Sequence, residues 1–314
     1  MKVIKAAKLN KNDLIGVISP SSLPSDLSRI NKGIEYLEKN GFRVKIGKNV
    51  GKFRGYLAGT DEERLEDIHD MFSDKEVKAI FAIRGGYGSG RLLEKINYNL
   101  IKKNPKIFVG YSDITALQMA IYSQTGLITF AGPMVAVDFG AEQINPFAEE
   151  NFWNMLTSNK KVGKILNPNN EKLFILNKGR GEGKLIGGNL AVLVSLLGSK
   201  YIPFFKDSIL FIEEIGESPY RVDRMLNQLK LSGILKSING ILLGRFVDCY
   251  ETDTEKRSLT LNEVIADYFS DMKVPVMYNF IHGHVDNTLT VPIGAKSKIN
   301  ASRGFIEINE NVLS

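Results

Sequence analysis

The chain has 314 residues, 43% of them hydrophobic and 24% charged, which is enough for two domains and excludes a disordered, collagen-like or coiled-coil protein. Its 41 Lys and Arg against 35 Asp and Glu give a formal charge of +6, without the basic block or the interleaved aromatic residues that indicate nucleic-acid binding. The single cysteine, Cys249, can form neither an internal disulfide nor a cysteine-rich zinc site, which favours a reducing, cytoplasmic compartment. The longest uncharged run, Ile114 to Val137, is interrupted by Gln118, Gly132 and Pro133, so a membrane span is not expected.

The first 140 residues alternate strand and helix patterns. A capping box at Thr60 to Glu63 starts one of the helices, and Gly126 ends another. The expected strands are 14–18, 42–46, 79–83, 107–109 and 127–130, and the expected helices are about 30–37, 61–72 and 114–122. This βαβ alternation predicts a mostly parallel sheet with helices on both faces, a Rossmann-like α/β fold.

Residues 140–180 are rich in Asn, Lys and Gly and carry little periodicity. We expect a linker at 151–180 between an N-terminal domain at 1–150 and a smaller, mixed α/β domain at 181–314. The second domain has helix patterns at 190–197, 221–229 and 262–269, strand patterns at 209–215 and 241–243, and a β-rich end at 274–309.

Two glycine-rich loops resemble phosphate-binding motifs but lack their spacing. In RGGYGSGR (84–91), the third glycine of G-x-G-x-x-G is replaced by Arg91 or Leu93, depending on the register. In GRGEGKL (179–185), Lys184 is followed by Leu185 instead of Ser or Thr. With only three histidines and no metal-binding motif, neither a cofactor nor a metal is expected.

GYSDIT (110–115) places Ser112 between a buried strand and a helix. A nucleophile elbow has this arrangement, because a tight turn exposes the hydroxyl and the helix N-terminus directs backbone N–H groups towards it. From the motif alone, a helix N-cap at Ser112 or Asp113 is the commoner explanation.

A serine nucleophile needs a general base and an acid that orients the base. His69 lies in a charged helix, so His282 and His284 are the better candidates for the base. Glu213 and Glu214, at the end of an apolar strand, are the candidates for the acid, and at least one of them should have only a structural role. The RGGYG loop follows a neighbouring strand, so its N–H groups could help to form an oxyanion hole.

These motifs resemble the LD-carboxypeptidases, a family of serine peptidases. The resemblance extends over almost the whole chain, through GVISPSS (16–22), YLAGTDEER (56–64), AIRGGYGSGRLL (82–93), PKIFVGYSDITAL (105–117), FAGPM (130–134), GGNLAVLVSLLGS (187–199), ILFIEEIGESPYRVDRMLNQL (209–229) and GHVDNTLTVPIGA (283–295). It implies that Ser112 is the nucleophile, Glu214 the acid and His284 the base. The implied oxyanion hole consists of the backbone N–H groups of Gly86 and Asp113. Many relatives have a histidine at Ala131, a position without a role in the triad.

The resemblance also implies the reaction, the hydrolysis of the bond between the L-centre of a diamino acid and the terminal D-Ala of a murein tetrapeptide in peptidoglycan recycling. It implies a cytoplasmic homodimer that binds a small peptide and neither nucleic acid nor membrane, with the active site between the two domains. The alternatives are a microcin C-type self-immunity peptidase acting on aminoacyl-adenylate analogues, and a non-catalytic peptide-binding relative. Stacking on a nucleobase by Trp153, the only tryptophan, would favour the microcin reaction, but core packing is the commoner role. The sequence does not identify the residues that line the specificity pocket.

Overall fold

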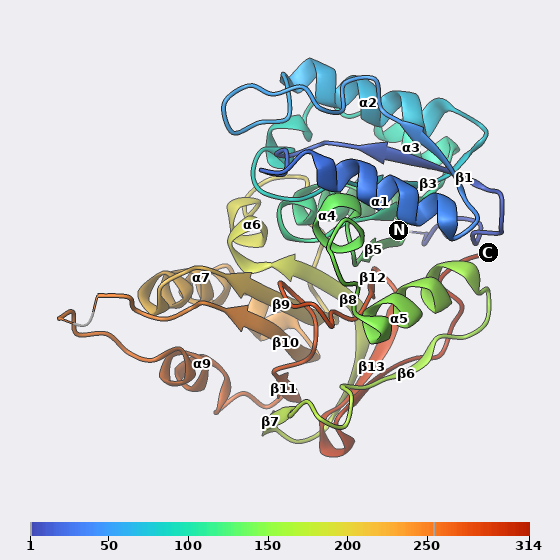
Figure 1. Ribbon diagram of the computed structural model, residues 1–314. Coiled ribbons are helices and arrows are strands. Elements are labelled where there is room, and N and C mark those ends of the chain that lie inside the picture. Colours follow the sequence, from blue (N-terminus) through green and yellow to red (C-terminus); the bar gives the residue numbers. More distant parts are fainter. Residues whose placement is uncertain (1, 254) are drawn as a thin grey trace.

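The computed structural model describes residues 2–253 and 255–314, whose strands form two sheets in a two-domain α/β fold (Figure 1). The first sheet has the strand order β12-β5-β4-β3-β1-β2. All neighbours in it are parallel except β12, which pairs antiparallel with β5. Its strands are β1 (Leu14–Ile18), β2 (Arg43–Ile46), β3 (Val77–Ala82), β4 (Ile107–Val109), β5 (Thr129–Ala131) and β12 (Val291–Ile293).

Helices cover both faces of this sheet, as the alternating pattern predicted. The step from β1 to β2 runs in the opposite direction to the step from β2 to β3, so right-handed crossovers place α1 and α2 on opposite faces. The capping box at Thr60 is present and starts α2. The helices of this part are α1 (Ser28–Lys39), α2 (Asp61–Ser73), α3 (Tyr98–Lys103) and α4 (Thr115–Thr125), with short turns η1 (Ser89–Leu92), η2 (Ser112–Ile114) and η3 (Val135–Phe139).

The second sheet is mixed, with the order β6-β14-β13-β8-β9-β10-β11-β7. The central strands β8 to β11 are parallel, whereas the strands on either side are antiparallel to their neighbours. Its strands are β6 (Gly163–Ile165), β7 (Phe174–Asn177), β8 (Arg180–Asn189), β9 (Ile209–Ile215), β10 (Gly240–Val247), β11 (Val276–Tyr278), β13 (Lys296–Asn300) and β14 (Phe305–Ile308). Its helices are α6 (Leu190–Ser195), α7 (Pro219–Leu231), α8 (Ile234–Ser237) and α9 (Leu261–Phe269).

The segment expected as a linker, 151–180, contains regular structure. The helix α5 (Pro146–Thr157) occupies its start, and β6 and β7 contribute both edge strands of the second sheet. Near the end of the chain, β12 returns to the first sheet, and Ser314 N donates to Ala6 O at 2.8 Å. The first domain therefore includes residues from the C-terminal part of the chain, and both ends of the chain lie close together (Figure 1).

No helix in the described part of the chain is both long enough and apolar enough to cross a membrane.

Candidate active site

Ser112 occupies a strained turn directly after β4. Its φ of 63° lies in the left-handed region, which a residue with a side chain adopts only at a cost of about 1–3 kcal/mol. Gly85, in the loop after β3, allows this close approach, because a Cβ there would lie 2.8 Å from Ser112 Cβ. The serine is partly exposed between two buried neighbours, Tyr111 and Asp113, and it lines a cavity. This geometry matches a nucleophile elbow, the less common of the two explanations that the GYSDIT motif allowed.

Asp113 joins three loops at the carboxyl ends of β1, β3 and β4. Its carboxylate Oδ2 accepts hydrogen bonds from Ser21 Oγ at 2.6 Å and from Ser89 N at 2.8 Å. Its carbonyl oxygen accepts from Ser89 Oγ at 2.5 Å. These bonds hold the glycine-rich loop 84–91 against the serine turn.

The two backbone N–H groups expected in the oxyanion hole are on this pair of loops. Gly86 and Asp113 line the same cavity as Ser112, and within the described residues neither N–H donates a hydrogen bond. Gly86 has a φ of +103°, and a Cβ there would lie 2.6 Å from Ser22 Oγ. Both N–H groups are therefore available to bind an oxyanion at the position of a substrate carbonyl.

His284 is held by a glutamate of β9. Its Nδ1 lies 2.9 Å from Oε2 of Glu213, whose side chain is 1% exposed. A carboxylate can only accept, so Nδ1 carries the proton and Nε2 is left as the basic nitrogen. Burial alone would lower the pKa of His284, but the hydrogen bond and charge of Glu213 outweigh it and raise the pKa above the ordinary histidine value.

The prediction that Glu214 holds His284 is wrong, because the structure places Glu213 there. Glu214 accepts instead from the side chain of Asn189 at 2.9 Å, from Ala191 N at 2.8 Å and from its neighbour Ile215 N at 2.9 Å. It lines the cavity beside α6, and burial raises its pKa to about 7. Glu214 therefore supports the start of α6 and shapes the cavity, but it does not contact the imidazole.

The alternation of side chains along β9 separates the two glutamates. Phe211 and Glu213 lie on the same side of the strand, and the Phe211 ring is 4.8 Å from the ring of His282. The opposite side carries Glu214. Both faces are buried, so the apolar pattern of the strand does not distinguish them. The contact of Phe211 with His282 distinguishes the two faces, but only the folded structure shows it.

The contacts of His282 are those of a histidine with a structural role. Its Nδ1 lies 2.6 Å from the carbonyl oxygen of Leu289, so this nitrogen donates, and burial lowers its pKa. The third histidine, His69, lies in α2 and accepts from Asn97 N at 3.0 Å. Of the three histidines, only His284 pairs with a carboxylate.

Tyr111 places His284 next to the serine turn. The rings of Tyr111 and His284 meet edge to face, with centroids 5.2 Å apart, and Ser112 is the next residue in the chain. No hydrogen bond joins Ser112 to His284 within residues 2–253 and 255–314. Such bonds commonly shorten only when substrate binds, so this geometry is compatible with a nucleophile and its base.

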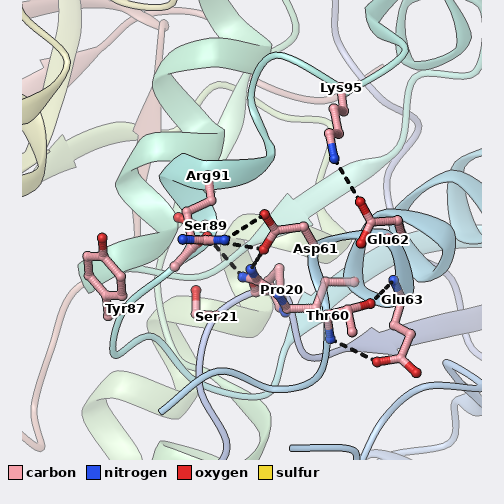
Figure 2. Close-up of polar contacts among 12 residues, drawn as sticks. Pro20, Ser21, Thr60, Asp61, Glu62, Glu63, Tyr87, Ser89, Arg91 and Lys95 are labelled. Carbon is pink, nitrogen blue, oxygen red and sulfur yellow. Dashed lines mark hydrogen bonds and ion pairs between the residues drawn. The ribbon is translucent and has the colours of Figure 1, made fainter. Parts of the chain in front are cut away.

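A buried arginine fixes the outer part of the glycine-rich loop. Arg64 donates to the carbonyl oxygens of Pro20 at 2.7 Å and Gly88 at 2.9 Å, and to Asp61 at 2.6 Å. Asp61 also accepts two bonds, each 3.0 Å long, from Arg91, which lines the cavity (Figure 2). This network connects α2 with the loops on which Ser21 and Gly86 lie.

Trp153 is half-buried and packs against the core, away from the cavity. Its ring stacks on Phe42 with centroids 4.8 Å apart, and its Nε1 donates to Tyr36 Oη at 2.7 Å. It is not among the residues that line the cavity beside Ser112. Core packing, the commoner of the two expected roles, is what the structure shows for this residue.

No group of three or more His, Cys, Asp and Glu side chains in the described part of the chain is arranged to hold a metal ion.

When the chain is compared with known proteins, both of its domains match the same protein family. Residues 15–132 match the LD-carboxypeptidase N-terminal domain, and residues 182–299 match the LD-carboxypeptidase C-terminal domain. A probable murein peptide carboxypeptidase from Bacillus subtilis (strain 168) is 43% identical, covering 98% of this chain and 95% of its own.

Two solved structures illustrate the similarity of the fold. Muramoyltetrapeptide carboxypeptidase from Oxalobacter formigenes has a TM-score of 0.82 at 31% identity, covering 95% of this chain and 98% of its own. The microcin C7 self-immunity protein MccF, in complex with aspartyl sulfamoyl adenosine, has a TM-score of 0.88 at 32% identity, covering 99% and 100%.

Proposed function

Because the chain belongs to the LD-carboxypeptidase family, we propose that it is a serine peptidase that removes the terminal D-Ala from murein tetrapeptides. The observation that supports this most directly is the pairing of two features at one place. Ser112 lies in a strained turn beside two N–H groups that donate no hydrogen bond to any described residue, and next to this turn His284 is oriented by a buried glutamate.

In the first step of the proposed reaction, Ser112 Oγ attacks the carbonyl carbon of the diamino acid, and Nε2 of His284 takes the hydroxyl proton. The carbonyl oxygen becomes negatively charged and accepts from the N–H groups of Gly86 and Asp113. Glu213 holds Nδ1–H and stabilises the imidazolium that forms. This step requires His284 to be neutral before the attack.

In the second step, the imidazolium returns its proton to the nitrogen of D-Ala, the C–N bond breaks, and D-Ala leaves. The acyl group remains on Ser112 as an ester. Water then attacks this ester with His284 again as base, releasing the shortened peptide and restoring the serine hydroxyl.

The test is to incubate the purified protein with a murein tetrapeptide and to follow the release of D-Ala by mass spectrometry. The wild type should convert tetrapeptide to tripeptide, and Ser112→Ala should lose about 10⁴- to 10⁶-fold in rate while remaining folded. Failure of the wild type to release D-Ala, or a Ser112→Ala variant close to wild-type activity, would contradict the proposal.

The second candidate function comes from the similarity to MccF, whose solved complex contains aspartyl sulfamoyl adenosine. Aminoacyl-adenylate analogues should therefore be tested in the same assay. Trp153, the residue that the sequence offered for stacking on a nucleobase, packs against the core and does not line the cavity. For this reason we favour the murein peptide as substrate.

We further propose that the enzyme is a cytoplasmic homodimer that acts on recycled murein peptides. This follows from the family resemblance and from the single, buried Cys249. Light scattering of the purified protein and cell fractionation would test the two parts separately.

A further inference from the structure

The cavity beside Ser112 has a volume of about 610 Å³, enough for an amino acid side chain and the groups next to it. The serine turn and the glycine-rich loop form one wall. The other wall comes from the ends of β8 and β9 and from α6, with Asn189, Ala191, Val192, Ser195, Leu196, Glu214, Ile215 and Glu217. A substrate whose carbonyl reaches Ser112 must place a neighbouring side chain against this second wall.

Most charged side chains that line the cavity already have close partners. Asp113 accepts from Ser21 and Ser89, and Arg91 donates two bonds to Asp61 (Figure 2). Glu214 accepts three hydrogen bonds, and burial raises its pKa to about 7, so its negative charge is only partly developed near neutral pH.

Glu217 is different, because within the described part of the chain its carboxylate has a single polar contact, and that contact is long. Its Oε2 lies 3.4 Å from Nη1 of Arg221, whose side chain is 57% exposed to solvent, whereas the side chain of Glu217 is 24% exposed. An ion pair with so exposed a partner contributes little and is easily exchanged. Of the charged groups that line the cavity, Glu217 is therefore the one most available to a ligand.

The end of β9 places Glu217 at this position. Gly216, with a φ of +72°, turns the chain, and its N–H donates to Val247 O at 2.9 Å. Glu217 follows and lies just before α7, a helix of 13 residues. The positive N-terminal end of a helix favours a negative charge there.

We propose that Glu217 binds the side-chain ammonium group of the residue whose carbonyl Ser112 attacks. The inference rests on the proposed function and narrows it, because the acyl-side residue must then be basic, as in a diamino acid. A hydrogen-bonded ion pair of this kind favours the charged substrate by about 10- to 100-fold. A side chain with a negative charge, such as the aspartyl group bound by MccF, is disfavoured at the same position.

The test compares two tetrapeptides that differ only by the ammonium group, one with Lys before D-Ala and one with norleucine. The wild type should prefer the lysine peptide by about 10- to 100-fold in kcat/KM, mostly through KM. Glu217→Gln should abolish this preference by lowering kcat/KM for the lysine peptide to about that for the norleucine peptide. Glu217→Lys should reverse it towards a peptide with Glu before D-Ala.

The matched control is Glu62→Gln. Glu62 lies in α2, pairs with Lys95 at 2.7 Å, and is 71% exposed outside the cavity, so its loss should leave the preference unchanged. Equal losses of Glu217→Gln on both peptides would overturn the inference and would leave the proposed function intact.

Binding measured by calorimetry in the Ser112→Ala background separates the two proposals. One outcome is that the wild type cleaves neither peptide, but the lysine peptide binds more tightly than the norleucine peptide and Glu217→Gln removes this difference in affinity. This outcome would support the cation site and show that the proposed reaction is wrong. Equal binding of both peptides, or no detectable binding of either, overturns the cation site.

Discussion

At the scale of single residues, the choice between Glu213 and Glu214 decides how His284 is oriented. Glu213 contacts the imidazole, whereas Glu214 accepts from Asn189 and two backbone N–H groups. Glu213→Gln should lower kcat by about 10⁴-fold, because the amide permits the wrong tautomer of His284. Glu214→Gln should cost far less in kcat and act mainly on KM. Steady-state kinetics of the two variants, with circular dichroism as a check on folding, would test this assignment; the reverse order would restore Glu214 as the acid.

The raised pKa of His284 predicts the pH dependence of the reaction. The base must be neutral, so kcat/KM should fall as pH decreases through a pKa above the ordinary value of about 6.5. Glu213→Gln removes the hydrogen bond and charge that raise this pKa, so the acid limb of its residual activity should move to lower pH. Glu214→Gln should move it less. An acid limb that stays in place in Glu213→Gln would contradict the pairing.

The Glu213–His284 pair also affects the stability of the fold. Its contribution to stability should decrease as pH rises, whereas kcat/KM should increase. A histidine with a raised pKa in the folded state binds its proton more tightly there than in the unfolded chain. The Glu213–His284 pair should therefore stabilise the fold most below about pH 6.5, and this contribution should disappear as pH rises through the raised pKa. Thermal unfolding of wild type and His284→Ala at pH 5.5 and pH 8.5 measures the difference, which should be larger at the lower pH.

At the scale of elements, the serine turn depends on the space that the neighbouring loop leaves. A methyl group at Gly85 would lie 2.8 Å from Ser112 Cβ and 3.2 Å from Asp113 N. Gly85→Ala should therefore displace the turn, lowering stability by about 1–3 kcal/mol and kcat by a larger factor than KM. The control is Gly90→Ala in the same loop, where the nearest atom would be Ala116 Cβ at 3.9 Å, and where the melting temperature should hardly change. Equal melting temperatures of the two variants would show that the turn tolerates the methyl group.

The elements themselves were predictable where the periodicity is strong. The capping box at Thr60, the end of α4 at Gly126 and the strands β1, β3, β4 and β9 are close to the expected positions. The edge strands β6 and β7 were not predicted, because they are short and partly exposed and their register depends on β14 and β11. The turn at Ser112 was predictable because the change from strand to helix is a local feature of the chain, although the motif alone favoured a helix N-cap there. The pairing of His284 with Glu213 was not, because it depends on which buried face of β9 meets a loop 71 residues later.

At the scale of the whole molecule, the two sheets share chain segments and direct contacts. The N–H of Asn189, at the end of β8, donates to Thr115 Oγ1 at 3.0 Å, and β12 is an edge strand of the first sheet although it comes from residues 291–293. Neither sheet keeps all of its neighbours when the other unfolds. We therefore expect a single cooperative unfolding transition for this two-domain chain.

The only tryptophan makes this expectation measurable. Trp153 packs against Phe42 and Tyr36, so its fluorescence reports on the first domain, whereas far-ultraviolet circular dichroism reports on both. In urea, the two signals and the loss of peptidase activity should share one midpoint. A fluorescence midpoint that differs clearly from the dichroism midpoint would show that the domains unfold separately.

The return of the chain to the first sheet has a consequence for the protein during its synthesis. Gly86, Ser112 and Asp113 leave the ribosome long before His284 and β12. The loop between β11 and β12 must also cross from one sheet to the other. A nascent chain that ends before these residues thus carries the proposed nucleophile, Ser112, without its proposed base and with one edge of the first sheet still open. Hydrolytic activity should therefore arise only after residues 284–293 have left the ribosome, when His284 can reach the serine turn and β12 can pair with β5.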